Sequence, residues 1–287
     1  MSGAGLRVER IRLQAVELEV RYQGRGPTML VLHGGGGPIT GLPFAQALAQ
    51  SHSLVEPVHP GFAGSAIPGH FDGMEDLVYC NLDLMDALDL QDVIVLGTSM
   101  GGWLAAEIAV RHARRIRQLV LVNAVGVKVG GRDYRDIVDI FASSSARLLQ
   151  CMWHDPAKAP DLTQMEEKQL QIMAANRTAL ALYTWDPYMH NPKLPGRMHR
   201  IKCPTLFLWG ESDGLVSVDY GRAYSNMIAG ARFKPFLAQG ICPISSNLSC
   251  SHKPCKRSRW RVKPMHPVRW YDNENLVLHR RRLSLSA

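Results

Sequence analysis

Ser99 is the residue of this sequence whose surroundings are best suited to covalent chemistry. It lies in Gly97-Thr98-Ser99-Met100-Gly101, which fits the pattern G-x-S-x-G. An apolar run precedes the motif and a helical pattern follows it, and a strand that turns directly into a helix exposes such a serine hydroxyl at the helix N-terminus. The sequence therefore predicts Ser99 as a nucleophile, in preference to a serine that occupies a turn by chance.

The glycine run His33-Gly-Gly-Gly-Gly-Pro38 follows the first strong apolar run. Consecutive glycines let backbone N–H groups approach a ligand closely, as an oxyanion hole requires. We expect the oxyanion donors to be the N–H groups of Gly35 and Met100, with His33 supporting the loop. No Lys-Ser/Thr pair follows the glycines, so the run does not fit a phosphate-binding P-loop.

Asp213 follows a late apolar run in the segment LWGESDG (208–214). In the chain order serine, acid, histidine, this is the place of the acid that orients the base. In the same order, the histidine that acts as the base follows the acid.

Four motifs, HGGGGP, HPGFAGS (59–65), GTSMGGW and GESDGLVS, together resemble the α/β-hydrolase superfamily, and within it the capped members that include esterases and hydrolases of meta-cleavage products. The resemblance extends from about residue 15 to about residue 238. It implies an α/β fold with a mostly parallel sheet flanked by helices, a nucleophile at Ser99, an acid at Asp213 and a helical cap over the pocket.

The resemblance also implies a small-molecule ester or related acyl substrate, and we expect no cofactor and no metal. Carbon–carbon hydrolases of this kind often carry Asn before the nucleophile, whereas this sequence has Thr98, which favours carboxylic esters. Hydrolysis of a carbon–carbon bond in a meta-cleavage product is the alternative enzymatic reading. A catalytically inactive or binding-only member of the fold is the reading outside enzymes.

The order of patterns predicts how the fold is divided along the chain. Apolar runs at 28–34, 53–60, 92–97, 118–126 and 204–210 predict strands, and the patterns at 74–90 and 101–116 predict helices. We expect a first part of the core at 15–126, a helical cap at 127–200 and a second part of the core at 201–238. The cap carries Trp153, Tyr183, Trp185 and Tyr188, which could line an acyl pocket or pack within the cap.

Charge and cysteine separate the last segment, 239–287, from the rest. Residues 1–240 hold 23 Lys+Arg and 23 Asp+Glu, whereas residues 241–287 hold 10 and 2, so the whole net charge of +8 lies there. A balanced body argues against nucleic-acid binding. The start of the chain has no signal-peptide pattern and no segment reaches membrane-spanning length, so we expect a cytoplasmic protein without a membrane partner.

The resemblance implies a catalytic histidine just under thirty residues after Asp213, where the sequence has Gly240-Ile241. Loss of a triad member removes several orders of magnitude of rate, so the sequence predicts that this chain lacks most of the activity its other motifs would support. A shift of reading frame near residues 234–239 accounts for the missing base. When QGICPISSNLS is back-translated and read one frame over, the new codons permit GHLPHLEQPE, which is the histidine motif of the family at the expected spacing. We therefore expect 239–287 to be a basic, disordered tail and the C-terminal part of the fold to be missing. Resequencing the gene through this region tests the hypothesis.

Other readings of the tail are weaker. His252, His266 or His279 could return to act as the base, but no strand-loop-helix pattern would position them. The spacing of Cys242, Cys250, His252 and Cys255 matches no standard zinc module. Nucleic-acid binding by the basic tail is less economical than out-of-frame translation.

Overall fold

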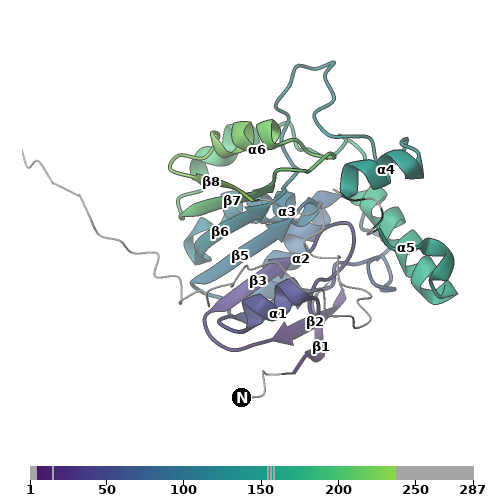
Figure 1. Cartoon of the computed structure of the whole chain (residues 1–287). Coiled ribbons are helices and arrows are strands. Elements are labelled where there is room, and N and C mark those ends of the chain that lie inside the picture. Colours follow the sequence, from purple (N-terminus) through teal and green to yellow (C-terminus); the bar gives the residue numbers. More distant parts are fainter. Residues whose placement is uncertain (1–4, 15, 154, 156, 158, 237–287) are drawn as a thin grey trace, which may run out of the picture. The chain divides into compact units, whose positions relative to one another are not determined.

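The computed structural model describes residues 5–14, 16–153, 155, 157 and 159–236, all of which belong to one compact unit spanning Met1–Cys250. Its centre is an eight-stranded sheet in the order β1-β2-β4-β3-β5-β6-β7-β8 (Figure 1). The first two strands pair antiparallel with their neighbours and the remaining pairs are parallel. The strands are β1 (Arg7–Arg12), β2 (Glu17–Gln23), β3 (Thr28–Leu32), β4 (Ser53–Pro57), β5 (Val93–Thr98), β6 (Ile116–Val122), β7 (Thr205–Gly210) and β8 (Arg232–Phe236).

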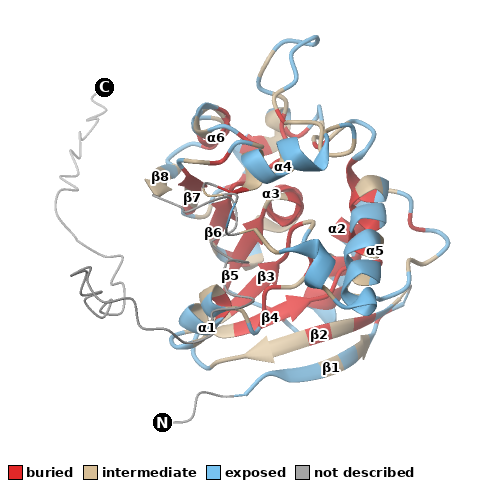
Figure 2. Ribbon diagram, turned by 45° about the vertical axis from the view of Figure 1, so that its right-hand side comes forward, coloured by how far each residue is buried: buried red, intermediate tan, exposed pale blue. Residues whose placement is uncertain are grey.

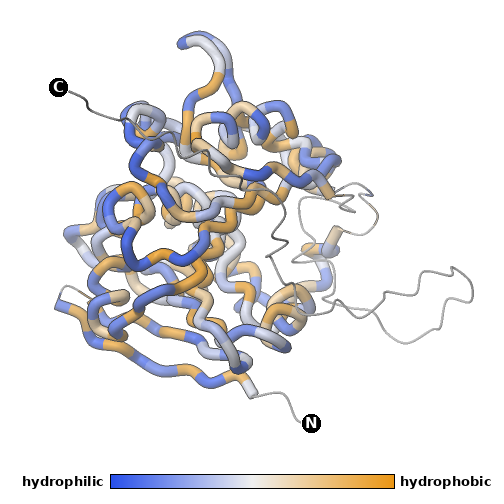
Figure 3. The backbone as a smooth tube through the Cα atoms, turned by 90° about the vertical axis from the view of Figure 1, so that its left-hand side faces the viewer, coloured by the Kyte–Doolittle hydropathy of each residue, from blue (hydrophilic) through white to orange (hydrophobic). Residues whose placement is uncertain are grey.

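The central strands are buried on both faces, as their continuous apolar runs predict. All six residues of β5 are buried, and Figure 2 shows the same burial along β3. The outer strand β1 differs, because four of the six residues in RVERIR are charged and none of the six is fully buried. Hydrophilic and hydrophobic positions follow one another along the lower strands of Figure 3. The sheet thus begins at Arg7, before the residue 15 at which the sequence placed the start of the core.

Helices cover the two faces of the sheet unequally. The larger apolar cluster joins one face to α2 (Met74–Ala87), α3 (Met100–His112) and α6 (Val218–Ser225). The smaller cluster joins the other face to α1 (Pro43–Ala49). Among the described residues, no helix combines the length and the apolar composition needed to cross a membrane.

A helical segment is inserted between β6 and β7, in the range 127–200 where the sequence predicts a cap. Its elements are α4 (Ser145–Met152), the 3₁₀ helix η3 (Leu162–Gln164), α5 (Glu167–Thr184) and the 3₁₀ helix η4 (Pro195–Arg200). Both α4 and α5 appear on the same side of the sheet in Figures 1 and 2, beyond the ends of the parallel strands. The expected tail at 239–287 lies outside the described residues.

Candidate active site

Ser99 occupies the tight turn between β5 and α3. Its backbone has φ 52° and ψ −117°, in a region that residues other than glycine rarely adopt, and it forms the N-cap of α3. The Ser99 N–H donates to Val122 O at 2.9 Å, and Ser99 O accepts from Gly102 N at 2.9 Å. A non-glycine residue held in such a conformation by its surroundings is typical of functional turns. The local geometry therefore has the form that the G-x-S-x-G motif predicts.

The glycine loop lies directly beside this turn. A Cβ added to Gly34 would stand 3.1 Å from Ser99 Cβ and 3.0 Å from Thr98 O, so a larger residue there would require its neighbours to shift by a few tenths of an ångström. Met100 is the first residue of α3, and its N–H therefore has no acceptor inside the helix. The two expected oxyanion donors thus come from segments that meet at Ser99.

His33 is built into the glycine loop. Its Nδ1 donates to Gly34 O at 2.9 Å, and its Nε2 accepts from His59 N at 3.1 Å. These two bonds require the tautomer with the proton on Nδ1. Burial lowers the pKa of His33 to about 4, so the ring is neutral near neutral pH. This arrangement supports the loop, in agreement with the role expected from the sequence.

Asp213 lies beyond β7 and is 8% exposed. Its Oδ1 accepts from the backbone N–H groups of Leu215 at 2.9 Å and Val216 at 2.8 Å. Its Oδ2 accepts from Asn123 Nδ2 at 2.7 Å. Burial raises the pKa of Asp213 to about 7, although these three hydrogen bonds each act to lower it. Oδ1 accepts two hydrogen bonds and Oδ2 accepts one, so the second lone pair of Oδ2 can accept a further hydrogen bond from a base that the carboxyl orients.

Asn123 is a site residue that the sequence did not reveal. It follows β6 with a positive φ of 46°, donates to Asp213 and accepts at Oδ1 from Gly210 N at 3.0 Å. One side chain therefore connects the ends of β6 and β7. No motif surrounds Asn123, and the only signal in the sequence is a polar residue placed directly after a buried strand.

The structure brings the sequence-predicted residues to one edge of the sheet. Ser99 follows β5 and Asp213 follows β7, with β6 and its Asn123 between them. Because neighbouring strands lie about 4.8 Å apart, the two strand ends are separated by about 10 Å. Among the described residues, no histidine hydrogen-bonds to Asp213. The position expected for the base, 240–241, lies outside those residues.

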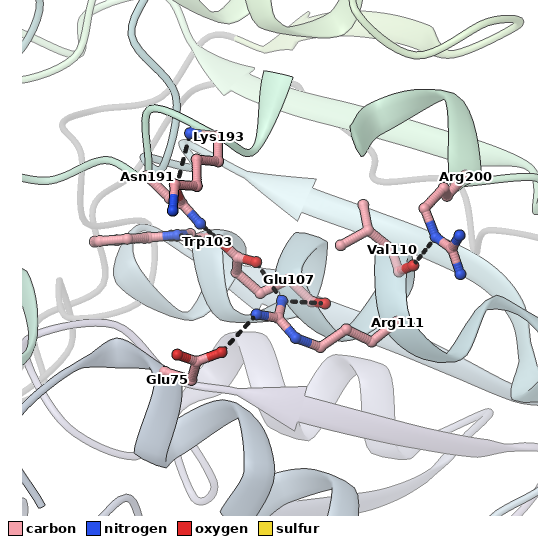
Figure 4. A network of polar contacts seen from close by, with 8 residues as sticks. All are labelled: Glu75, Trp103, Glu107, Val110, Arg111, Asn191, Lys193 and Arg200. Carbon is pink, nitrogen blue, oxygen red and sulfur yellow. Dashed lines mark hydrogen bonds and ion pairs between the residues drawn. The ribbon is translucent and has the colours of Figure 1, made fainter. Parts of the chain in front are cut away.

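A partly buried ionic network is centred on Glu107 of α3, about two helical turns after Ser99 (Figure 4). Glu107 is 2% exposed and accepts from Trp103 Nε1 at 3.1 Å, from Asn191 Nδ2 at 2.7 Å and from Arg111. Arg111 in turn reaches Glu75 of α2 at 3.2 Å. These residues border a cleft of about 720 Å³ whose lining does not include Ser99. The network therefore fixes the helix that carries the serine and lies outside the serine's own surroundings.

The four aromatic residues that the sequence proposed for an acyl pocket differ in burial: Trp153 and Tyr183 are buried and Tyr188 is half-buried, whereas Trp185 is 56% exposed. Tyr183 stacks on Phe62 with ring centroids 6.5 Å apart, and its hydroxyl donates to Pro60 O at 3.1 Å. Trp185 and Tyr188 each contact the ring of Phe141. Trp153 is buried. Within the described part of the chain, no group of three His, Cys, Asp or Glu residues is placed to hold a metal ion.

Comparison with known proteins gives three results of different weight. The family model described as alpha/beta hydrolase fold matches residues 27–237. The 2-hydroxymuconate semialdehyde hydrolase of Pseudomonas sp. (strain CF600) is 31% identical over 117 residues, which are 39% of this chain and 41% of that protein. The 2-hydroxy-6-oxononadienedioate/2-hydroxy-6-oxononatrienedioate hydrolase of Paraburkholderia xenovorans (strain LB400) is 27% identical over 237 residues, covering 72% of this chain and 78% of that protein.

Among solved structures, naproxen esterase (carboxylesterase NP) from Bacillus subtilis superposes with a TM-score of 0.65 at 15% identity, covering 84% of this chain and 87% of that chain. Identity this low shows a shared fold alone. The first of the relatives above is matched over less than half its length, so its activity does not transfer with the alignment.

Proposed function

Because the chain belongs to the alpha/beta hydrolase fold family, we propose that it is a serine hydrolase that cleaves carboxylic esters through an acyl-enzyme on Ser99. The observation that carries the proposal is the strained turn at Ser99, with the glycine loop so close that a Cβ added to Gly34 would stand 3.1 Å from the Ser99 Cβ. A hydroxyl held at a helix N-terminus beside backbone N–H groups is the arrangement that acyl transfer requires.

In the proposed reaction, the Ser99 hydroxyl adds to the ester carbonyl and the carbonyl oxygen becomes an oxyanion. The N–H groups of Met100 and Gly35 stabilise that oxyanion, and the alcohol leaves with a proton to give the acyl-enzyme. Water then releases the acid and regenerates the serine. Asp213 has the role of orienting the base, and Asn123 holds the Asp213 carboxylate by its Oδ2 edge.

Cleavage of a carbon–carbon bond is the second candidate. The two relatives described above are named as hydrolases of that kind of substrate, which favours it. That reaction needs additional groups that hold a dienoate and protonate a carbon atom. Ester hydrolysis needs only the serine, the oxyanion donors, the acid and a base. We therefore place the ester first, and we propose that the inserted segment is a cap over the substrate.

A paired assay separates the readings. A short-chain nitrophenyl ester and a meta-cleavage product would be offered to the full chain and to Ser99→Ala under the same conditions. We expect slow ester turnover by the full chain, because the sequence has no histidine at the position expected for the base. That turnover should fall further in Ser99→Ala, because the proposed route passes through an acyl-enzyme on Ser99. Turnover of the meta-cleavage product alone would favour the second candidate. No turnover of either by folded protein would favour a binding-only member of the fold.

A further inference from the structure

One face of helix α5 is pressed against two loops of the core. The buried residues of the helix recur at the spacing of a single helical face: Asn176, Ala179, Leu180, Tyr183 and Thr184. The loops they meet are the glycine loop at 33–37 and the loop at 59–63. Both follow parallel strands, β3 and β4, and so lie at the edge of the sheet that carries Ser99.

Asn176 connects these two loops with a single amide group. Its Nδ2 donates to Gly36 O at 3.0 Å, and its Oδ1 accepts from Ala63 N at 2.9 Å. The residue is 6% exposed. Asparagine is a poor helix former, and a buried amide is costly unless it is hydrogen-bonded. An asparagine inside a helix with both halves of its amide bonded to distant loops therefore has a role beyond forming the helix.

The glycine loop is fixed on both sides of Gly35. On one side, Gly34 O accepts from His33 Nδ1 at 2.9 Å and from Gly37 N at 3.1 Å. On the other side, Gly36 O accepts from Asn176. The N–H group of Gly35 lies between these two fixed carbonyls, so its direction depends on both.

Leu180 of α5 packs against the same loop at Gly35. A Cβ added to Gly35 would stand 2.5 Å from Leu180 Cδ2, so the helix and the glycine are already in close packing. A similar contact occurs in the second loop, where a Cβ on Gly61 would stand 2.7 Å from Ala179 Cβ. Movement of α5 away from the core would break the two Asn176 bonds and the Tyr183 bond to Pro60 O together.

We propose that Asn176 is a positioning residue, which holds the glycine loop so that the Gly35 N–H points at the oxyanion. In this arrangement α5 is a fixed wall of the active site that stays in place during turnover. The inference rests on the proposed function for the role of Gly35, whereas the connection through Asn176 is a property of the fold.

The consequence for catalysis is specific. An oxyanion forms only during the reaction, so a misplaced donor slows the chemical step and leaves ground-state binding unchanged. Removing one oxyanion donor outright costs about 10²–10³ in rate, and a loosened donor is expected to lose part of that, about 10-fold to 100-fold.

The experiment compares three variants of the full chain. Asn176→Ala removes both bonds. Asn176→Asp keeps the acceptor for Ala63 N–H and replaces the donor to Gly36 O with a carboxylate oxygen. Thr178→Ala, on an exposed position of the same helix, is the control. Thermal unfolding is measured for each so that rates refer to folded protein.

The first readout is hydrogen exchange of the amides, which does not depend on activity. We expect faster exchange at 34–37 in both Asn176 variants, faster exchange at Ala63 in Asn176→Ala only, and no change in Thr178→Ala. Unchanged exchange at 34–37 in Asn176→Ala would overturn the proposal.

The second readout is the reaction of Ser99 with a fluorophosphonate, resolved into probe binding and maximal rate. We expect the maximal rate to fall about 10-fold to 100-fold in Asn176→Ala with probe binding unchanged. An equal fall in Thr178→Ala, or a fall in binding alone, would contradict positioning by Asn176. If the parent chain itself fails to react, the proposed function fails for this chain, and the exchange data still decide whether Asn176 holds the loop.

Discussion

Asp213 combines deep burial with the anionic role that we propose for it. Its three hydrogen-bond donors are two backbone N–H groups and the amide of Asn123, and none of them carries a charge. Burial therefore dominates and raises the pKa of Asp213 from 3.8 to about 7. A cationic imidazole that donated a further hydrogen bond to Oδ2 would supply the positive charge that these three donors lack.

This pKa makes the stability of the folded chain depend on pH. Between about pH 4 and pH 7 the folded state keeps a proton that the unfolded state releases, so the contribution of Asp213 to stability falls as the pH rises through that window. The limiting slope is about 1.36 kcal/mol per pH unit for one group. Asp213→Asn does not ionise, and its stability escapes this loss.

We predict that the melting temperature of Asp213→Asn relative to the parent becomes more positive, by several degrees, between about pH 5 and about pH 8. The test is how the difference in melting temperature changes with pH. Its value at a single pH also includes the effect of placing a new amide opposite the Asn123 Nδ2 group. Thermal scans across that range provide the measurement. A difference independent of pH would mean that a charged partner already neutralises Asp213.

At the scale of elements, α3 depends on the buried carboxylate of Glu107. Glu107 and Glu75 both bind the same Arg111, but the side chain of Glu107 is 2% exposed and that of Glu75 is 70% exposed. The two glutamates share one cationic partner and differ in burial, so replacing each in turn shows how burial changes the contribution of a carboxylate to stability. Only at Glu107 would loss of the carboxylate leave buried donors without an acceptor.

We predict that Glu107→Ala lowers the free energy of unfolding by about 2–4 kcal/mol, because it leaves the Trp103 and Asn191 donors without their acceptor and leaves Arg111 with Glu75 as its remaining ionic partner. Glu75→Ala should cost no more than about 1 kcal/mol. Urea denaturation of the two variants checks the difference. Equal losses would show that the network contributes little to holding α3.

The elements differ in how far the sequence could predict them. The runs that became β3, β5 and β7 are apolar throughout, because both faces of those strands are buried, and such runs are unambiguous. The outer strand β8, RFKPF, contains Lys234 and Pro235 and was not predicted, since an edge strand needs no continuous apolar run.

The candidate site divides in the same way. Ser99, Asp213 and the glycine loop could be found because a tight turn or a close approach restricts the residue types at several consecutive positions. Asn123 and Asn176 act through single amide groups whose partners are distant in sequence, so no local pattern marks them. Only the folded arrangement shows that each connects two loops.

At the scale of the whole molecule, the chain before residue 238 carries the family's motifs and the chain after it carries the net charge. The frame hypothesis stays a prediction, since 237–287 lie outside the described residues. The hypothesis concerns the base, which would take the proton of Ser99 and be oriented by Asp213.

We predict that a gene shifted back to the alternate frame near codon 239 yields a chain that reacts with a fluorophosphonate at Ser99 about 10³-fold faster or more. The added histidine would take the serine proton while Asp213 orients the ring. Time-resolved labelling of both chains, with Ser99→Ala as the control, gives the comparison. A gene without GHLPHLE coding in that frame, or equal labelling rates, would rule the hypothesis out.

The amide of Asn123 also bears on how freely the inserted segment can be exchanged. It ties the C-terminal ends of β6 and β7 together at the edge of the sheet where that segment leaves β6. If a foreign segment were grafted between these strands, Asp213 would therefore still be held in place by Asn123. The foreign segment would not inherit the support that α5 gives to the glycine loop, so a functional graft must also reproduce the amide at position 176 and the leucine four residues later.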